Sequence, residues 1–147
     1  MERAAGNAAL TRAQPPVIWL AGAAIIYLGL DLGLGGMHTL GWQGPTDFIA
    51  VTDETRFAVQ DSHARFVGGV WLGVGLIFLA GSFAVDRFRN ALIAMCALIF
   101  IGGLVRFASM DFDILFGMQV LPSLLAELIV FPALGFWLLS TGRRTGS

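Results

Sequence analysis

No residue from Phe66 to Val85 carries a formal charge, and this feature limits the possible folds most strongly. An α-helix rises about 1.5 Å per residue, so the segment is long enough to cross the roughly 30 Å hydrocarbon layer of a bilayer. Its repeated glycines lower helix stability in water but let neighbouring helices approach closely in lipid. We therefore expect a membrane-spanning helix packed inside a bundle.

The composition of the whole chain agrees with a membrane protein. Hydrophobic residues make up 56% of the sequence and charged residues 13%, whereas soluble domains carry about 25% charged residues. The net charge of −1 gives no reason to expect nucleic acid as a partner. The single cysteine, Cys96, excludes an internal disulfide and a multi-cysteine metal site, and we interpret it as a small buried packing residue.

Three further apolar segments are long enough to span a bilayer, which predicts an all-α, integral membrane four-helix bundle with up-down antiparallel connections. We expect the first segment to be a mature helix rather than a cleaved signal peptide, because its apolar core is too long for one. The predicted organisation is a polar tail at 1–14, a four-helix domain at 15–140 with spans at about 17–35, 66–85, 91–108 and 120–140, and a polar tail at 141–147.

Prolines, glycines and polar residues place the ends of these helices. Pro15 and Pro16 predict the start of the first helix, and the glycine-rich stretch 33–36 predicts its end. Part of the connection 37–64 is expected to form an amphipathic helix in the membrane interface, with Trp42 at headgroup level. We expect a tight turn at 86–90, a short acidic loop at 109–118, and a kink in the fourth span caused by Pro122 and Pro132.

Arginine is distributed unevenly between the predicted connections. Both tails and the turn at 86–90 are rich in arginine, whereas the other two connections hold six acids against Arg56 and Arg65. Cytoplasmic connections of membrane proteins carry the excess of basic residues. We therefore predict that both termini face the cytoplasm.

Ionisable residues inside the spans predict a buried polar cluster. An isolated charge at a helix centre costs about 2.5–3.5 kcal/mol on insertion, so such groups should find one another. Side chains lean toward the N-terminus of their own helix, which brings Arg106 of the third span and Glu127 of the antiparallel fourth span to a similar depth. The predicted cluster, near the outer leaflet, comprises Asp31, Arg65, Arg106 and Glu127, with His63 and Asp61 as possible accessory residues.

This cluster has three possible roles: a lock for helix register, a pocket for a ligand or lipid headgroup, or a path for protons or ions. The formal charges of its four members cancel, and arginine hardly ever releases its proton. Both facts favour the register lock over proton transfer, while the pocket for a ligand or headgroup stays open as an alternative.

Other residues give no support for metal, cofactor or catalytic chemistry. His38 stands alone in a connection, His63 has only Asp61 nearby, and neither lies within a span, so we expect no metal and no haem. No nucleophile has a base beside it, and we do not expect an enzyme. The glycines are interpreted as helix-packing positions rather than phosphate-binding loops, and the main ones are Gly29, Gly33, Gly68, Gly69, Gly73, Gly102 and Gly103.

Three sequence blocks together resemble a known family. They are HARFVGGVWLGVGLIFLAG, RFRNALIAMCALIFIGGLVRFAS and LLAELIVFPALGFWLL. Their arginine before a glycine-rich second helix, their Gly-Gly-x-x-Arg and their early glutamate resemble the small bacterial four-helix membrane proteins catalogued as domain of unknown function 4345. The resemblance covers residues 17–140, and the DoxX-like proteins share a similar outline. It implies a membrane protein of the bacterial inner membrane and names no substrate.

Two functional classes follow from these observations. The first is a non-enzymatic scaffold or accessory subunit, whose glycine faces and aromatic rim contact a larger membrane complex or a second copy of the chain. The second is a binder or carrier of a small amphiphile, such as a lipid or a quinone, that uses the polar cluster. In both classes the lipid bilayer is the common partner.

The orientation can be tested with a reporter fused after Ser147. Because both tails and the turn at 86–90 are rich in arginine, we expect a reporter that is active only in the cytoplasm to be active at this position. A periplasm-specific reporter should be inactive there, and activity of the periplasmic reporter alone would contradict the predicted orientation.

Overall fold

The computed structural model describes residues 2–39 and 51–142, with side chains described for 13–39 and 51–141. The predictions for Trp42 and for the arginines of the C-terminal tail fall outside these residues. All elements of the described chain are helices, as the sequence predicts. Four of them are long and apolar enough to cross a membrane: Ala13–His38, Glu54–Phe83, Val85–Ser109 and Leu121–Thr141.

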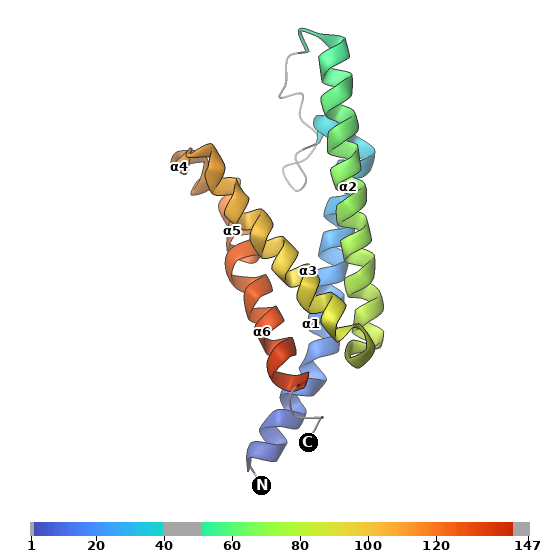
Figure 1. Ribbon diagram of the computed structural model, residues 1–147, viewed down its shortest axis with the longest axis vertical. Coiled ribbons are helices and arrows are strands. Elements are labelled where there is room, and N and C mark those ends of the chain that lie inside the picture. The colour runs from blue at the N-terminus through green and yellow to red at the C-terminus, as the bar shows by residue number, and fades with distance from the viewer. Residues whose placement is uncertain (1, 40–50, 143–147) are drawn as a thin grey trace. The chain divides into compact units, whose positions relative to one another are not determined.

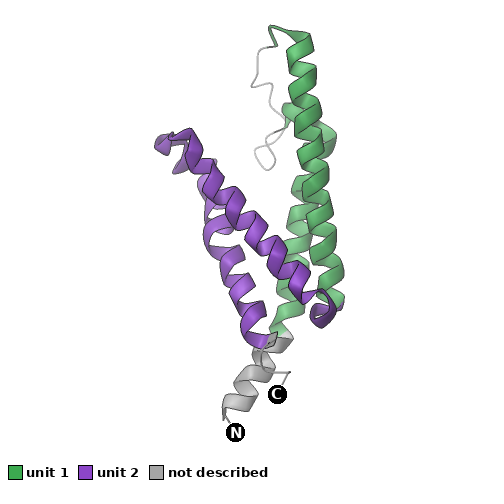
Figure 2. Ribbon diagram, in the orientation of Figure 1, with its two compact units in different colours: residues 1–83 green, residues 84–147 purple. Residues whose placement is uncertain are grey.

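The chain divides into two compact units, Met1–Phe83 and Ala84–Ser147 (Figure 2). Each unit contains two of the four candidate spans, and we call them the first and the second hairpin. Each hairpin is described by itself.

The first hairpin contains α1 (Glu2–Gly35), the short 3-10 helix η1 (Gly36–His38) and α2 (Glu54–Phe83). The helices α1 and α2 run side by side (Figure 1). A Cβ atom on Gly22 would lie 2.8 Å from the backbone nitrogen of Leu79, and one on Gly29 would overlap the backbone of Leu72. Residue numbers rise along one helix as they fall along the other, so the pair is antiparallel, and glycines allow its backbones to touch.

Three predicted helix boundaries are wrong. Pro15 and Pro16 lie inside α1, which begins at Glu2 rather than at the prolines. Residues 54–64 belong to α2 rather than to a separate interfacial helix, and residues 86–90 belong to α3 rather than to a turn. In each case the polar residues or prolines beside an apolar run mark the limit of the apolar span. The helix itself continues past them. The end of α1 at the glycine-rich stretch is confirmed.

The second hairpin begins directly after Ala84. It contains α3 (Val85–Val105), the 3-10 helix η3 (Arg106–Ser109), α4 (Phe112–Leu115), α5 (Leu121–Leu125), the π-helix η4 (Ala126–Val130) and α6 (Phe131–Gly142). The helices α3 and α6 pack against each other (Figure 1). The buried apolar side chains of these two helices are those of Leu92, Cys96, Ile99, Leu134 and Leu138.

The fourth span is interrupted by the π-helix η4, which ends two residues before Pro132. Proline has no backbone N–H, and its ring would collide with the carbonyl four residues earlier in a regular α-helix. The wider turn avoids this collision: the N–H of Phe131 bonds to the carbonyl of Ala126, five residues back. The irregularity expected from the prolines therefore takes the form of a π turn, and it contains Glu127.

Paired glycine substitutions test the close contact of α1 with α2. A Cβ on Gly75 would lie 2.7 Å from the backbone nitrogen of Ile26, whereas one on Gly73 would have no atom within 4 Å. Alanine favours a helix over glycine by about 1 kcal/mol, while overpacking costs about 1–3 kcal/mol. We expect Gly75→Ala to lower the thermal unfolding temperature in detergent and Gly73→Ala to leave it unchanged or raise it. Equal shifts for the two variants would contradict this packing.

Candidate functional site

Arg106 and Glu127 form a bidentate ion pair within the second hairpin. Arg106 Nε donates to Glu127 Oε2 over 2.7 Å, and Arg106 Nη2 donates to Glu127 Oε1, also over 2.7 Å. Arg106 is the first residue of η3, directly after α3, and Glu127 lies in the π turn of the fourth span. Two parallel charge-assisted hydrogen bonds fix both the distance and the relative orientation of the two helices.

Gly103 makes room for this pair. A Cβ atom at this position would lie 2.8 Å from the Cβ of Glu127 and 3.3 Å from its Oε2, so any larger residue would displace the glutamate. The neighbouring Gly102 has no atom within 4 Å of the same ideal position. Of the two consecutive glycines, only Gly103 is therefore required by the ion pair.

The two partners differ in their exposure. The side chain of Glu127 is 9% exposed, and that of Arg106 is 40% exposed. Pairing replaces two separate charges by one neutral unit, which lowers the cost of placing them in a membrane. The remaining nitrogen of the guanidinium, Nη1, donates no hydrogen bond to a described residue.

A second charged group closes the first hairpin. Asp61 of α2 accepts hydrogen bonds from the backbone N–H of Met37 over 2.7 Å and from Arg65 Nε over 2.6 Å. Arg65 Nη1 in turn donates to the carbonyls of Leu34 and Gly33 at the end of α1. The last carbonyls of a helix have no partner within the helix, so Arg65 supplies one from the neighbouring helix.

Gly36 is required where the chain leaves α1 toward Asp61. Its φ angle is +61°, a backbone conformation that glycine adopts at little cost. A Cβ atom at this position would also overlap Oδ1 of Asp61 and lie 3.0 Å from Nε of Arg65. Backbone conformation and available space therefore both favour glycine at this position.

The other predicted site residues of the first hairpin lie near this group. Asp31 accepts a hydrogen bond from the hydroxyl of Thr39. The ring of His38 packs against that of Phe57, with centroids 5.1 Å apart. His63 is exposed on α2, where it lines an open depression of about 570 Å³.

The structure thus brings the predicted cluster residues together in two groups, one in each hairpin. Arg65 is joined to Asp61, and Arg106 is joined to Glu127. A single cluster that unites Asp31, Arg65, Arg106 and Glu127 stays a prediction. Among the described side chains, no three His, Cys, Asp or Glu residues converge as metal ligands would.

The predicted packing glycines occupy different surroundings. Cβ atoms on Gly29 and Gly68 would overlap the facing helix, and one on Gly33 would be in ordinary contact with Gly68 at 3.6 Å. Gly69 and Gly73 resemble Gly102, with no atom within 4 Å.

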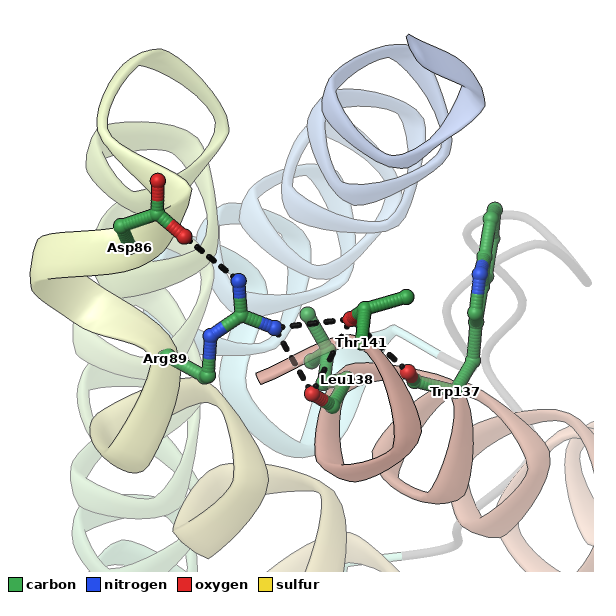
Figure 3. Close-up of polar contacts among 5 residues, drawn as sticks. All are labelled: Asp86, Arg89, Trp137, Leu138 and Thr141. Carbon is green, nitrogen blue, oxygen red and sulfur yellow. Dashed lines mark hydrogen bonds and ion pairs between the residues drawn. The ribbon is translucent and has the colours of Figure 1, made fainter. Parts of the chain in front are cut away.

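Sequence reasoning missed a third arginine contact, at the other end of the second hairpin (Figure 3). Arg89 Nη1 donates to the carbonyl of Leu138 over 2.7 Å and to the hydroxyl of Thr141 over 2.8 Å, at the end of α6. Arg89 Nη2 is held by Asp86, one turn earlier on α3. The arginine that indicated membrane orientation therefore also stabilises the end of a helix.

One sequence signal could have located both helix-end arginines. In each hairpin an aspartate stands one helical turn before the arginine, at i−4 for Arg65 and at i−3 for Arg89. Such spacing places the carboxylate on the same face as the guanidinium and fixes its direction. Three of the four acceptors are backbone carbonyls, which have no sequence signature.

A family model described as Domain of unknown function (DUF4345) matches residues 15–139 of the 147-residue chain. The chain belongs to this family. The resemblance noted in the sequence is thus confirmed, and the matched range covers most of both hairpins and every charged residue of the groups described above. No curated protein and no solved structure matches the chain.

The contact of Arg89 with α6 can be tested against its neighbour Arg87. Arg87 is exposed and makes no polar contact with a described residue, whereas the side chain of Arg89 is 14% exposed. We expect Arg89→Met to destabilise the protein by about 1–3 kcal/mol, because the carbonyl of Leu138 and the hydroxyl of Thr141 lose the charged donor that joins α3 to α6. Arg87→Met should change stability by less than about 0.5 kcal/mol.

Thermal unfolding in detergent measures both variants. Each removes one positive charge from the start of α3, so an effect through membrane orientation would change both alike. Equal stability of the two variants would contradict the structural role of Arg89.

Proposed function

We propose that this chain is a non-enzymatic multi-pass membrane protein, a scaffold or accessory subunit whose ionised groups hold its helices in register. The observation that supports this proposal most directly is the bidentate pair of Arg106 and Glu127. The two charges neutralise each other in a tight contact, for which Gly103 provides the space. A group that moved protons or ions would need a partner that changes its protonation, and arginine does not.

The proposal includes an orientation and a location. Both termini face the cytoplasm of a bacterial inner membrane, and the two hairpins form one four-helix bundle. Because successive spans alternate in direction, the ends of α1 and α3 and the starts of α2 and α5 then lie on the outer side. Asp31, Arg65, Arg106 and Glu127 then lie in the outer halves of the four spans, and the proposal unites them in one polar cluster.

A specific observation favours one second candidate, the binding of a small amphiphile. Arg106 is 40% exposed even though it is paired, and its Nη1 has no partner among the described residues. A guanidinium with free donors near a membrane surface suits an anionic or strongly polar headgroup. In this second role Arg106 contacts the ligand, and Glu127 orients the arginine.

Single and double substitutions at the pair distinguish the two roles. If the pair is a structural lock, Arg106→Leu and Glu127→Gln should each destabilise the protein by about 1–3 kcal/mol, because each leaves a partly buried group without its partner. The double variant should then lose less than the sum of the two single variants. Thermal unfolding of the protein extracted in mild detergent gives these values.

A matched control is available in the exposed pair of Arg56 with Asp53. These groups are 3.3 Å apart, with side chains 88% and 49% exposed, so Arg56→Leu should cost less than about 1 kcal/mol. If both single variants at Arg106 and Glu127 remain as heat-stable as the parent, the structural lock is wrong.

Native mass spectrometry of the same samples tests the second candidate. An amphiphile bound by Arg106 should be retained by the parent and by Glu127→Gln and lost from Arg106→Leu. A stoichiometric protein partner or a second copy of the chain, with no bound small molecule, supports the scaffold role instead.

A further inference from the structure

The connection between α3 and α5 exposes more apolar surface than a water-facing loop should. Five of its large apolar side chains are between 51% and 80% exposed, namely those of Met110, Phe112, Ile114, Phe116 and Met118. The rings of Phe112 and Phe116 stack with centroids 6.4 Å apart, so they form one continuous surface. Leu115 is buried, and its short helical segment, α4, contacts η3 of the same hairpin.

The backbone of this connection is largely bonded to itself. The N–H groups of Leu115 and Phe116 donate to the carbonyls of Asp111 and Phe112, and that of Gly117 donates to Ile114. The N–H groups of Val120 and Leu121 both donate to the carbonyl of Gly117. These bonds reduce the number of backbone groups that would need water, which suits a segment in contact with lipid.

The length of the connection keeps it at the membrane surface. It comprises residues 110–120, between the candidate spans Val85–Ser109 and Leu121–Thr141. Both spans end beside it, so its apolar side chains lie at the depth where the bilayer changes from acyl chains to headgroups. Lipid at that boundary is the one partner that is present wherever these helices cross the membrane.

The charges of the connection exclude an electrostatic attraction to anionic lipid. Residues 107–142 contain no basic residue, and the connection carries two acids, Asp111 and Asp113. Asp111 is used locally, because its carboxylate accepts from the backbone N–H of Ile114 over 3.2 Å. Attraction to the membrane at this point must therefore come from apolar contact.

We propose that the connection 110–120 is an interfacial anchor: it lies within the headgroup–acyl boundary of the leaflet in which α3 ends, with its exposed apolar side chains in lipid. The anchor begins four residues after Arg106. It therefore fixes the depth of the end of α3 in the membrane, independently of whether the ion pair serves structure or ligand binding.

Site-directed spin labelling of the full chain in phosphatidylcholine vesicles tests this proposal. Nitroxide labels are placed in turn at Ile114→Cys, Met118→Cys and Asp113→Cys, the last as a polar neighbour on the same segment. Cys96 is 2% exposed, so the parent chain carried through the labelling reaction provides the blank. Collision with oxygen, which concentrates in lipid, is compared with collision with a water-soluble nickel chelate.

We expect labels at Ile114 and Met118 to collide severalfold more with oxygen, relative to the nickel chelate, than the label at Asp113. Calibration with spin-labelled lipids should place them roughly 5–10 Å below the headgroup surface. Replacing part of the lipid with phosphatidylglycerol should not increase this depth.

Two outcomes would overturn the proposal. Dominant access of the nickel chelate at Ile114 and Met118 would show a loop in water, and low access of both reagents would show that protein covers the segment. Neither result depends on the role of Arg106. The experiment can therefore reject the anchor without rejecting the proposed function.

Discussion

Unpaired polar groups at the ends of membrane helices are the constraint on which this structure depends. The last carbonyls of each helix have no partner within the helix, and in lipid an unsatisfied group costs several kcal/mol. In each hairpin an arginine of one helix donates to acceptors at the end of the other: Arg65 to two carbonyls of α1, and Arg89 to the carbonyl of Leu138 and the hydroxyl of Thr141 in α6. An aspartate one turn earlier holds each arginine in place.

The exclusive use of arginine as the basic residue suits this arrangement. The chain contains no lysine, and the planar guanidinium carries five donors that can serve a carboxylate and a carbonyl at once. Lysine would offer a single, more strongly hydrated ammonium group in the same place. The same geometry allows Arg106 to bind both oxygens of Glu127.

The sequence was sufficient to predict the helical class and the four spans, because apolar length is a direct requirement of the bilayer. The closeness of Arg106 to Glu127 could also be anticipated, since side-chain direction brings them to one depth. The helix ends could not be placed: α1 continues through Pro15 and Pro16, and α2 begins at Glu54. Polarity marks the limit of the membrane, whereas a helix can continue into water.

Two features of the charged groups were not predictable for a different reason. The acceptors of Arg89 include a backbone carbonyl, and every residue type has one. The π turn before Pro132 shifts the register of the fourth span, and it thereby decides which side chain turns toward Gly103. Proline indicates that the helix is irregular, but the choice between a kink and a wide turn depends on packing against α3.

The spacing of these contacts along the chain determines the order in which a ribosome can complete them. Arg65 emerges when Asp61 and the end of α1 have already been synthesised, so the first hairpin has all its partners at once. Arg89 emerges with Asp86 but precedes the carbonyl of Leu138 by 49 residues. During translation the second hairpin therefore stays open until α6 has been synthesised, while the first is already closed.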